Sequence, residues 1–295
     1  MISLASQHAQ ETGASISALC RSLGLSRSTF YRHAKHKAPP ELTDTALCDS
    51  LHKVALEFPC YGYRRITAAL KRQGFCINHK RVLRLMREDN LLCLRKRRFT
   101  KTTDSEHDLP IYQNLAAKLS VTGIDQLWVA DITYIRLTSE FVYLAIVLDA
   151  FSRRVIGWHL SRRLDAGLSV TALSMALRTR QPASGLVHHS DRGVQYAAAE
   201  YTDLLKASGI QISMSRVGNP YDNAKAERFM KTLKYEQVYL CEYENLAEAK
   251  ASIADFIERV YNHKRLHSAL GYLPPAEFEE IHRQRQHEES KETTP

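Results

Sequence analysis

The segment Leu127–Asp149 reads LWVADITYIRLTSEFVYLAIVLD, and its composition decides the fold class. Residues 127–137 and 141–149 are rich in Val, Ile, Leu and aromatic side chains, as strands are. The second stretch is almost entirely apolar, which predicts a strand that is covered on both faces. Further strands are expected at 153–160, 186–189 and 209–214, and helices at 165–180, 197–208, 222–238 and 246–262. The pattern predicts an α/β domain whose five strands are covered by helices on both faces.

Asp131 is out of place in the first of these strands, because most of its neighbours are apolar. Asp is disfavoured in strands, and a buried, unpaired carboxylate costs free energy that a bound cation would offset. Asp191 follows the fourth strand and precedes Gly193, where it is either a turn residue or part of a site. Glu227 lies in a predicted helix, where glutamate is ordinarily exposed. Asp131 is therefore the strongest single candidate for a functional residue. Asp191 and Glu227 become candidates because they occur together with it.

Together the three carboxylates predict a site for divalent metal ions. Two like charges about 4 Å apart repel by roughly 4 kcal/mol at an effective dielectric constant near 20, so three acids that meet need a cation. Hard oxygen ligands favour Mg²⁺ or Mn²⁺ over zinc. Two such ions activate a water molecule or a 3′-hydroxyl and stabilise the leaving oxygen in an in-line displacement at phosphorus. We therefore expect Asp131, Asp191 and Glu227 to be catalytic and metal-binding residues of an enzyme that cuts and joins DNA.

Positive charge is concentrated in the N-terminal third of the chain. Lys and Arg outnumber Asp and Glu by more than two to one in residues 1–104, whereas the two kinds nearly balance in the remainder. The net charge of +9 therefore arises in this third. Such an asymmetry indicates a nucleic-acid-binding segment joined to a domain of another kind. A basic surface that is merely solvated is the alternative.

Residues 15–33 predict two short helices around a tight turn. Apolar residues recur at helical spacing before Gly24, which ends the first helix. Ser26 is a candidate cap for the second helix, whose first turn presents Arg27, Ser28 and Thr29. This is the layout of a helix-turn-helix, whose second helix enters the major groove of DNA. An ordinary helical hairpin is the alternative.

A second helical unit is expected over residues 44–95, with one helix near 44–57 and a helical pair after it. The pair begins at Tyr61-Gly62-Tyr63-Arg64-Arg65-Ile66, and Asn78 caps its second helix. Basic side chains on its outer face would neutralise DNA phosphates, unless they only solvate an amphipathic helix. The residues of this unit that are expected to bind DNA are Arg64, Arg65, His79, Lys80 and Arg81.

A basic run, Arg95-Lys96-Arg97-Arg98, stands at the junction between the basic third and the rest of the chain. Charge runs are usually just exposed, but this position favours an arm that follows the DNA backbone. Residues 96–118 are expected to form an extended linker.

Membrane insertion and secretion have no support in the sequence. No run of 18 apolar residues is present, and the first residues do not resemble a signal peptide. The six cysteines form no Cys-x-x-Cys pair, so free thiols in a reducing cytoplasm are expected. A zinc module built from His33, His36, Cys48 and Cys60 is disfavoured, because eleven residues separate its two cysteines.

Four motifs are specific enough to indicate a family. They are Trp128-Val129-Ala130-Asp131-Ile132-Thr133-Tyr134, His189-Ser190-Asp191-Arg192-Gly193-Val194-Gln195-Tyr196, Asn219-Pro220-Tyr221-Asp222-Asn223-Ala224 with Glu227, and Tyr261-Asn262-His263-Lys264-Arg265-Leu266-His267-Ser268-Ala269-Leu270-Gly271-Tyr272. Through them the chain resembles the DDE transposases of the insertion-sequence-three family, which share the catalytic core of retroviral integrases. The resemblance covers nearly everything from about residue 15 to 280.

The resemblance implies a ribonuclease-H-like fold with a five-stranded mixed sheet and flanking helices, preceded by all-α helix-turn-helix segments. It also implies that Asp131, Asp191 and Glu227 form the metal-binding triad, with two Mg²⁺ or Mn²⁺ ions. Lys234, seven residues after Glu227, would contact DNA near the active site. The substrates would be double-stranded DNA from the element ends and the target, and several copies of the chain would assemble on that DNA.

In this family the catalytic chain is often read from the second of two overlapping frames, and the upstream frame adds a DNA-binding and coiled-coil segment. No long leucine heptad is present here, so we expect the second-frame product alone, with the upstream-frame protein as a fusion or partner. The expected division is a helix-turn-helix at 1–38, a helical DNA-binding domain at 44–95, a linker at 96–118, the catalytic core at 119–282 and a disordered tail at 283–295.

Three groups of residues allow two interpretations each. His188 and His189 either orient a ligand or water, or pack inside a strand. Residues 219–222 suggest a mobile loop, while Asp222 or Asn223 is a candidate cap for the helix of Glu227. Tyr261, Asn262, His263 and Arg265 either bind DNA or pack the last helices on the core.

Two other functions stay open beside transposition. A metal-dependent nuclease of the same fold would hydrolyse DNA without joining it. A non-catalytic DNA-binding regulator, derived from a transposase, would not need the intact acidic triad.

Overall fold

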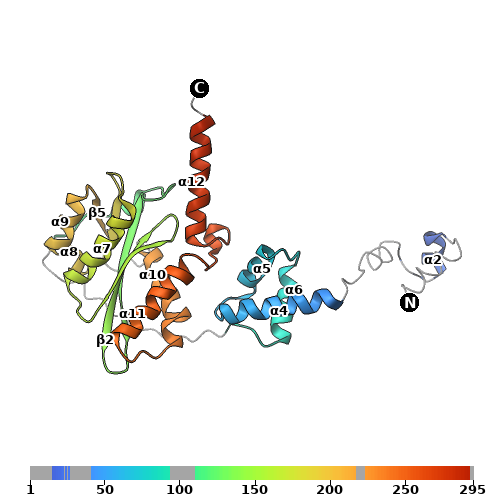
Figure 1. Ribbon diagram of the computed structural model, residues 1–295. Coiled ribbons are helices and arrows are strands. Elements are labelled where there is room, and N and C mark those ends of the chain that lie inside the picture. Colours follow the sequence, from blue (N-terminus) through green and yellow to red (C-terminus); the bar gives the residue numbers. More distant parts are fainter. Residues whose placement is uncertain are drawn as a thin grey trace.

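A mixed sheet of five strands lies at the centre of the computed structural model (Figure 1). The strands β1 (Leu127–Arg136), β2 (Phe141–Asp149) and β3 (Val155–Ser161) form an antiparallel meander. The strands β4 (Val187–Ser190) and β5 (Gln211–Met214) add to the other edge of β1, parallel to it. The order β3-β2-β1-β4-β5 is that of the ribonuclease-H-like fold, so the predicted fold class is confirmed. The structure describes residues 15–22, 24, 26, 41–93, 110–216 and 223–292.

Helices cover both faces of this sheet, as the alternating pattern predicted. One face packs against α7 (Ala166–Arg180), α8 (Val194–Ala197) and α9 (Ala199–Ala207). The other packs against α10 (Ala224–Glu236), η2 (Val238–Leu240), α11 (Leu246–Asp255) and the π-helix η3 (Phe256–Tyr261). Because side chains alternate across a strand, odd-numbered residues of β1 such as Val129 and Ile135 face α10 and α11, whereas Trp128 and Ala130 face α7 and α9.

A separate helical unit precedes the sheet. It comprises α4 (Glu41–Glu57), α5 (Tyr63–Arg72) and α6 (His79–Glu88), packed around Leu51, Ile66 and Met86. The predicted cap of α6 is confirmed, because the side chain of Asn78 accepts a hydrogen bond from the Lys80 amide at 2.9 Å. Further towards the N-terminus the structure describes α2 (Ile16–Ser22), and the second helix of the predicted helix-turn-helix lies outside the described residues.

The helical unit contacts the C-terminal part of the domain that contains the sheet. The Leu266 amide donates to the Tyr61 hydroxyl at 2.8 Å, and the Leu266 side chain belongs to the core of the helical unit. Arg72 makes a two-fold hydrogen bond to Glu277, and Lys264 pairs with Glu57 at 2.6 Å. Segments about 200 residues apart in the sequence are thereby joined.

The end of the chain differs from its prediction. The tail 283–295 was expected to be disordered, whereas α12 (Pro275–Glu292) continues through most of it and projects away from the sheet (Figure 1). The run Arg283–Lys291 is rich in Arg, Gln, Glu and Lys, which favour helix, and contains no Gly or Pro. The base of α12 is held by Glu279, which is fully buried, accepts from Ser152 and pairs with Arg154 and Arg180.

No helix in the described ranges is both long and apolar enough to cross a lipid bilayer. The short helices η1 (Ala116–Lys118) and η4 (Ser268–Leu270) complete the elements that the structure describes.

A candidate acidic active site at the split between two parallel strands

Asp131 on β1 and Asp191, directly after β4, occupy matching positions relative to the pairing of these parallel strands. Along β1 and β4, Leu127 pairs with Val187, Trp128 with His188 and Val129 with His189, and the pairing ends there. Asp131 and Asp191 each lie two residues beyond the last pair, where the two segments separate. Adjacent strands are about 4.8 Å apart, so the register brings the two carboxylates to one place.

Strand alternation also decides which helix faces the two acids. Val129 and Val187 both belong to the apolar core under α10 and α11, and Asp131 and Asp191 follow them at even intervals along the strands. The acids therefore point to the face that α10 covers. Glu227 is on the first turn of α10, and Ala226 and Phe229 beside it are buried in that core. The three predicted acids thus come from two strands and one helix that meet at the same face.

The pKa values of Asp131 and Glu227 are both raised. Burial raises the pKa of Asp131 well above its usual value, and the charges of Asp191 and Glu227 raise it further. Burial and the charge of Asp191 likewise raise the pKa of Glu227. Such mutual repulsion is what a bound cation would relieve.

Backbone amides orient the two aspartates. The amide of Ile132 donates to Asp131 Oδ1, and the amide of Gly193 donates to Asp191 Oδ1, both at 2.9 Å. A side chain on residue 193 would crowd this carboxylate, because a Cβ atom there would lie 3.1 Å from Asp191 Oδ1. Arg192 donates from Nε to the Ser215 carbonyl at 2.8 Å.

The donor set suits a hard divalent cation, since three carboxylates supply oxygen ligands. Within the described ranges, however, no three Asp, Glu, His or Cys side chains are arranged closely enough to hold a metal ion. Glu227 is exposed, whereas Asp131 and Asp191 are half-buried.

Lys234 lies beside the acids on the same helix as Glu227. Its Nζ atom is 4.3 Å from the centre of the Tyr134 ring, a cation–π contact. Burial lowers the pKa of Lys234, while the charges of Tyr134 and Asp131 oppose that effect. The sequence predicted Lys234 but not Tyr134, because a contact between a strand and a helix about a hundred residues later leaves no local pattern.

The two histidines before Asp191 pack inside the sheet. Both are fully buried. His188 Nε2 lies 2.9 Å from the Tyr201 hydroxyl, and His189 bridges the hydroxyls of Ser213 and Ser215 at 2.8 and 3.0 Å. Of the two interpretations that the sequence allowed, the structure supports packing.

The C-terminal motif also packs rather than facing solvent. Tyr261, Asn262 and Arg265 are nearly fully buried, and only His263 of the four residues is exposed. Arg265 makes a two-fold hydrogen bond to Glu236 at the end of α10, with both distances 2.6 Å. Asn262 bonds the backbone of Val155 on β3 through both halves of its amide.

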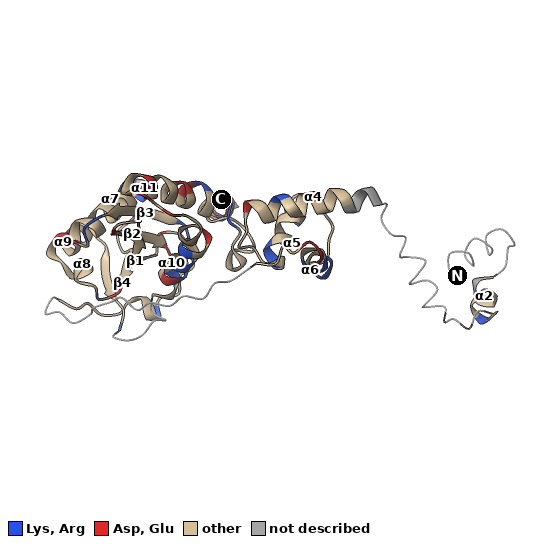
Figure 2. Ribbon diagram, turned by 90° about the horizontal axis from the view of Figure 1, so that it is seen from below, with Lys and Arg blue, Asp and Glu red and all other residues tan. Residues whose placement is uncertain are grey.

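The predicted DNA-binding residues have different environments. Arg64, His79 and Lys80 are exposed on α5 and α6, and Figure 2 shows Lys and Arg positions, coloured blue, on these helices and on α10. Arg65 instead lies over the Tyr61 ring, with Nη1 4.0 Å from Glu236. Arg81 is half-buried. The others, Arg27, Ser28, Thr29, Arg95, Lys96, Arg97 and Arg98, lie outside the described residues.

Asn223 makes a contact that the sequence did not predict. It is the N-cap residue of α10, as expected, but its side chain does not cap the helix. Its Nδ2 donates instead to the carbonyl of Ala130 at 2.9 Å.

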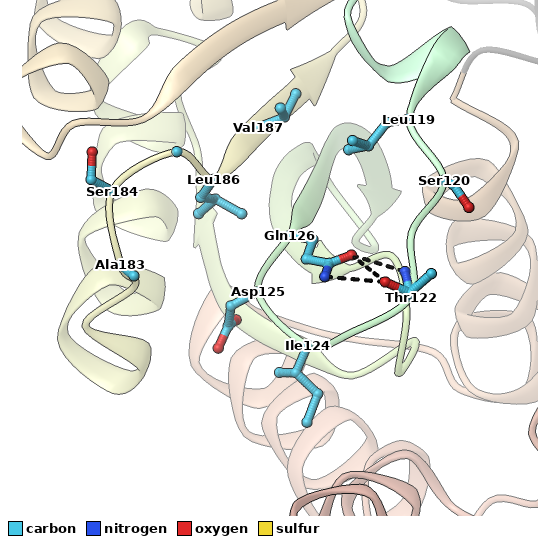
Figure 3. A pocket seen from close by; sticks show the side chains of 11 residues that line it. Leu119, Ser120, Thr122, Ile124, Asp125, Gln126, Ala183, Ser184, Leu186 and Val187 are labelled. Atoms are coloured by element: carbon cyan, nitrogen blue, oxygen red, sulfur yellow. Dashed lines mark hydrogen bonds between the residues drawn. The ribbon is translucent and has the colours of Figure 1, made fainter. Parts of the chain in front are cut away.

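A pocket of about 500 Å³ lies at the opposite end of the same strands (Figure 3). It is lined by Leu119, Gln126 and Val187 among others, and Gln126 and Thr122 are hydrogen-bonded at its wall. Val187 starts β4, whereas Asp191 follows its end, so this pocket is separate from the acids.

Comparison with known proteins gives matches over most of the chain. Two models described as an integrase core domain match residues 122–220 and 208–275, and one described as an HTH-like domain matches residues 43–99. The transposase InsF of insertion sequence IS3A from Escherichia coli strain K12 is 36% identical over 270 residues, covering 90% of this chain and 94% of the relative. An uncharacterized 31 kDa protein of insertion element IS600 from Shigella sonnei is 38% identical over 273 residues, covering 90% and 99%.

Among solved structures, an intasome of simian T-cell lymphotropic virus in complex with the PP2A regulatory subunit B56 gamma is similar at 17% identity. The similarity covers 74% of this chain and 70% of that chain, with a TM-score of 0.44.

Proposed function

This chain belongs to the insertion-sequence-three family of DDE transposases, and from that premise we propose that Asp131, Asp191 and Glu227 are its catalytic triad. The observation that carries the proposal is the register of β1 and β4, which brings two acids to the point where parallel strands separate. The helix that covers this face supplies the third acid. The chain is thus an enzyme whose substrate is DNA, and the assignment of its chemistry to these residues is our inference.

The three carboxylates would hold two Mg²⁺ or Mn²⁺ ions. Their oxygen atoms, and the raised pKa values of Asp131 and Glu227, support a hard divalent cation. When bound, such ions supply an activated water or 3′-hydroxyl and stabilise the leaving oxygen at phosphorus. Because Glu227 is exposed in a site that lacks a closed ligand set in the described residues, we infer that the triad closes when cations bind.

Other residues of this chain would bind and orient the DNA. Lys234, held over Tyr134 beside Asp131, would neutralise a phosphate next to the reacting bond. Arg64, His79 and Lys80 on the exposed side of the helical unit would contact phosphates further from the site. The N-terminal residues Arg27, Ser28 and Thr29, with the arm Arg95-Lys96-Arg97-Arg98, stay proposed contacts with element-end DNA.

Assembly on DNA is part of the proposal. Joining an element to a target requires two element ends in one complex, so several copies of the chain would act together. The upstream-frame protein stays a proposed fusion or partner. Mass photometry on paired-end DNA would test the copy number, and one copy per DNA end with no paired complex would contradict this part.

The decisive experiment uses duplexes that carry the inverted repeats flanking this reading frame. With Mg²⁺ or Mn²⁺, the full chain is expected to produce 3′-hydroxyl nicks and then joined strand-transfer products. Asp131→Asn and Asp191→Asn should each lower both rates by at least about a thousandfold, as expected when metal-assisted phosphoryl chemistry is lost. Asp203→Asn, which alters an exposed acid paired with Lys206, is the matched control and should leave the rates unchanged.

The same experiment separates the two rival functions. Nicks without joined products, even from pre-cut ends, would favour a nuclease. If Asp191→Asn left every DNA phenotype unchanged, a non-catalytic regulator would be favoured and the triad would be wrong.

A further inference from the structure

Asn223 connects two of the proposed catalytic elements through one buried side chain. The residue is only 5% exposed, although it begins a helix directly after residues outside the described ranges. Its Nδ2 donates to the Ala130 carbonyl at 2.9 Å, across 93 positions of the sequence. An N-cap asparagine ordinarily bonds an amide in the first turn of its own helix, which this one does not do.

The acceptor of this bond belongs to the peptide that joins Ala130 to Asp131. Pairing between β1 and β4 ends at Val129 and His189, so Ala130 is the first residue of β1 beyond that pairing. The amide of Asn223 thus bonds the backbone at the point where the sheet opens, directly before the first catalytic acid.

The backbone of Asn223 continues the connection to the third acid. The Glu227 amide donates to the Asn223 carbonyl at 3.2 Å, the first hydrogen bond of α10. A single residue is therefore bonded both to the peptide preceding Asp131 and to the amide of Glu227. Besides the contact of Lys234 with Tyr134 near the other end of the helix, α10 packs on the sheet through buried apolar residues such as Ala226 and Phe229. Apolar packing is non-directional, whereas a hydrogen bond fixes distance and angle.

We propose that Asn223 is a positioning residue that sets the separation between Glu227 and Asp131, and so the affinity of the triad for divalent cations. The inference rests on the proposed function, because it assumes that these acids hold the ions. A constellation that binds metal needs its ligands within about 0.5 Å of the working geometry. Without the Asn223 amide, the first turn of α10 would keep its packing but lose the bond that fixes it to β1.

Asn262 provides a matched control within the same chain. It is also 5% exposed, and its Nδ2 also donates to a strand carbonyl, that of Val155 on β3, at 2.9 Å. It differs in its location, since β3 is two strands away from β1 in the sheet. If Asn223 only stabilises the fold, the two substitutions should have the same consequences.

The test measures Mn²⁺ binding to the full chain by the electron paramagnetic resonance signal of free Mn²⁺, and steady-state cleavage of element-end DNA. Asn223→Ala is expected to weaken Mn²⁺ binding by roughly tenfold, the lower end of the effect seen for groups that orient metal ligands. The kcat for cleavage should fall while the KM for DNA stays unchanged, because Asn223 is buried and does not reach the DNA surface. Asn262→Ala should change the melting temperature but keep Mn²⁺ affinity within about twofold of wild type.

A second variant guards against loss of folding. Asn223→Ser keeps a hydroxyl that can cap α10 but is too short to bond Ala130, so the helix stays folded and the Mn²⁺ affinity should still fall. Wild-type Mn²⁺ affinity in both Asn223 variants, or an equal loss in Asn262→Ala, would overturn the positioning role. Equal Mn²⁺ binding by wild type and Asp191→Asn would instead overturn the proposed metal site, and this inference with it.

Discussion

Gly157 shows how one residue determines the distance between a helix and the sheet. A Cβ atom at this position of β3 would overlap the carbonyl oxygen of Ala172 and come within 2.9 Å of Ala176 Cβ, both on α7. The backbone of α7 therefore rests directly on the strand. Because α7 covers the face opposite the acids, its contact with β3 stabilises the sheet without touching the site.

Gly157→Ala is accordingly expected to lower the free energy of unfolding by about 3 kcal/mol, the upper range for overpacking in a core. Gly62→Ala is the matched control, because nothing lies within 4 Å of a Cβ atom there and its backbone suits alanine. It should cost less than about 1 kcal/mol. Urea denaturation measures the free energy of unfolding of both variants. Equal losses in the two would contradict the close contact between β3 and α7.

His188 is predicted to make the fold sensitive to acid. Burial lowers its pKa to about 3, so the folded chain excludes a proton that the unfolded chain takes up below its ordinary value of 6.5. The contribution of neutral His188 to the free energy of unfolding is therefore fully present above pH 6.5. It is lost as the pH falls from 6.5 towards 3. One such group gives a slope of about 1.4 kcal/mol per pH unit in this window.

His188→Gln removes the titrating group and keeps a polar side chain beside Tyr201. Unfolding free energies from urea titrations between pH 7 and pH 5 should fall less steeply in this variant than in wild type, by about that slope. Parallel pH profiles for the two chains would show that His188 is protonated in the folded state.

At the scale of elements, α10 is held at both of its ends. Asn223 bonds β1 at the first turn, and Glu236 in the last turn receives the guanidinium of Arg265, whose side chain is 5% exposed. Arg65 of the helical unit approaches the same carboxylate at 4.0 Å. The helix that carries Glu227 is therefore joined to the strand at its start and to the helical unit at its end.

Glu236→Ala would leave Arg265 buried without its charge partner. Breaking a buried pair from one side costs about 3–5 kcal/mol, so a loss of this size is expected in urea denaturation. Glu88→Ala removes an exposed partner of Arg84 with a 3.2 Å contact and should cost no more than about 0.5 kcal/mol. If both substitutions lower the free energy of unfolding equally, the Arg265 guanidinium must be solvated by water in the folded chain.

Elements differed in how well the sequence predicted them, and for physical reasons. The bounds of β2 were predicted correctly because nearly every residue is apolar, and Asp131 was noticed because a carboxylate stands among such neighbours. The extension of α12 was missed because its charged sequence lacks an apolar stripe. The bond from Asn223 to Ala130 had no local signal at all, since capping explains an asparagine at that position equally well.

At the scale of the whole molecule, the proposed catalytic acids and the exposed basic residues of α5 and α6 occupy different parts of the chain. The acids lie in the domain that contains the sheet. The exposed basic residues of α5 and α6 belong to the helical unit, which contacts that domain through Tyr61 and Leu266. Affinity for DNA is therefore expected to depend on this unit, and the rate of the reaction on the core.

The salt dependence of DNA binding tests this division. Each phosphate that a basic residue neutralises adds about 0.9 to the slope of log K against log salt concentration. Lys80→Ala removes an exposed lysine of α6 and should reduce the slope by about that amount, measured by fluorescence anisotropy on an element-end duplex. Arg65→Ala, which removes a residue engaged with Tyr61 and Glu236, should leave the slope unchanged. The reverse result would place Arg65, and not Lys80, on the DNA.

The pairing of β1 with β4 has a consequence for how such chains diverge. The polypeptide between Asp131 and Asp191 passes through exposed turns at 138–139 and 183–185, where extra residues can be accommodated without altering either strand. Loss of one residue inside β1 between Val129 and Asp131 would rotate the carboxylate to the opposite side of the sheet. Homologues should therefore vary freely in the interval that separates the two aspartates, while keeping each aspartate two residues past the last rung of the ladder.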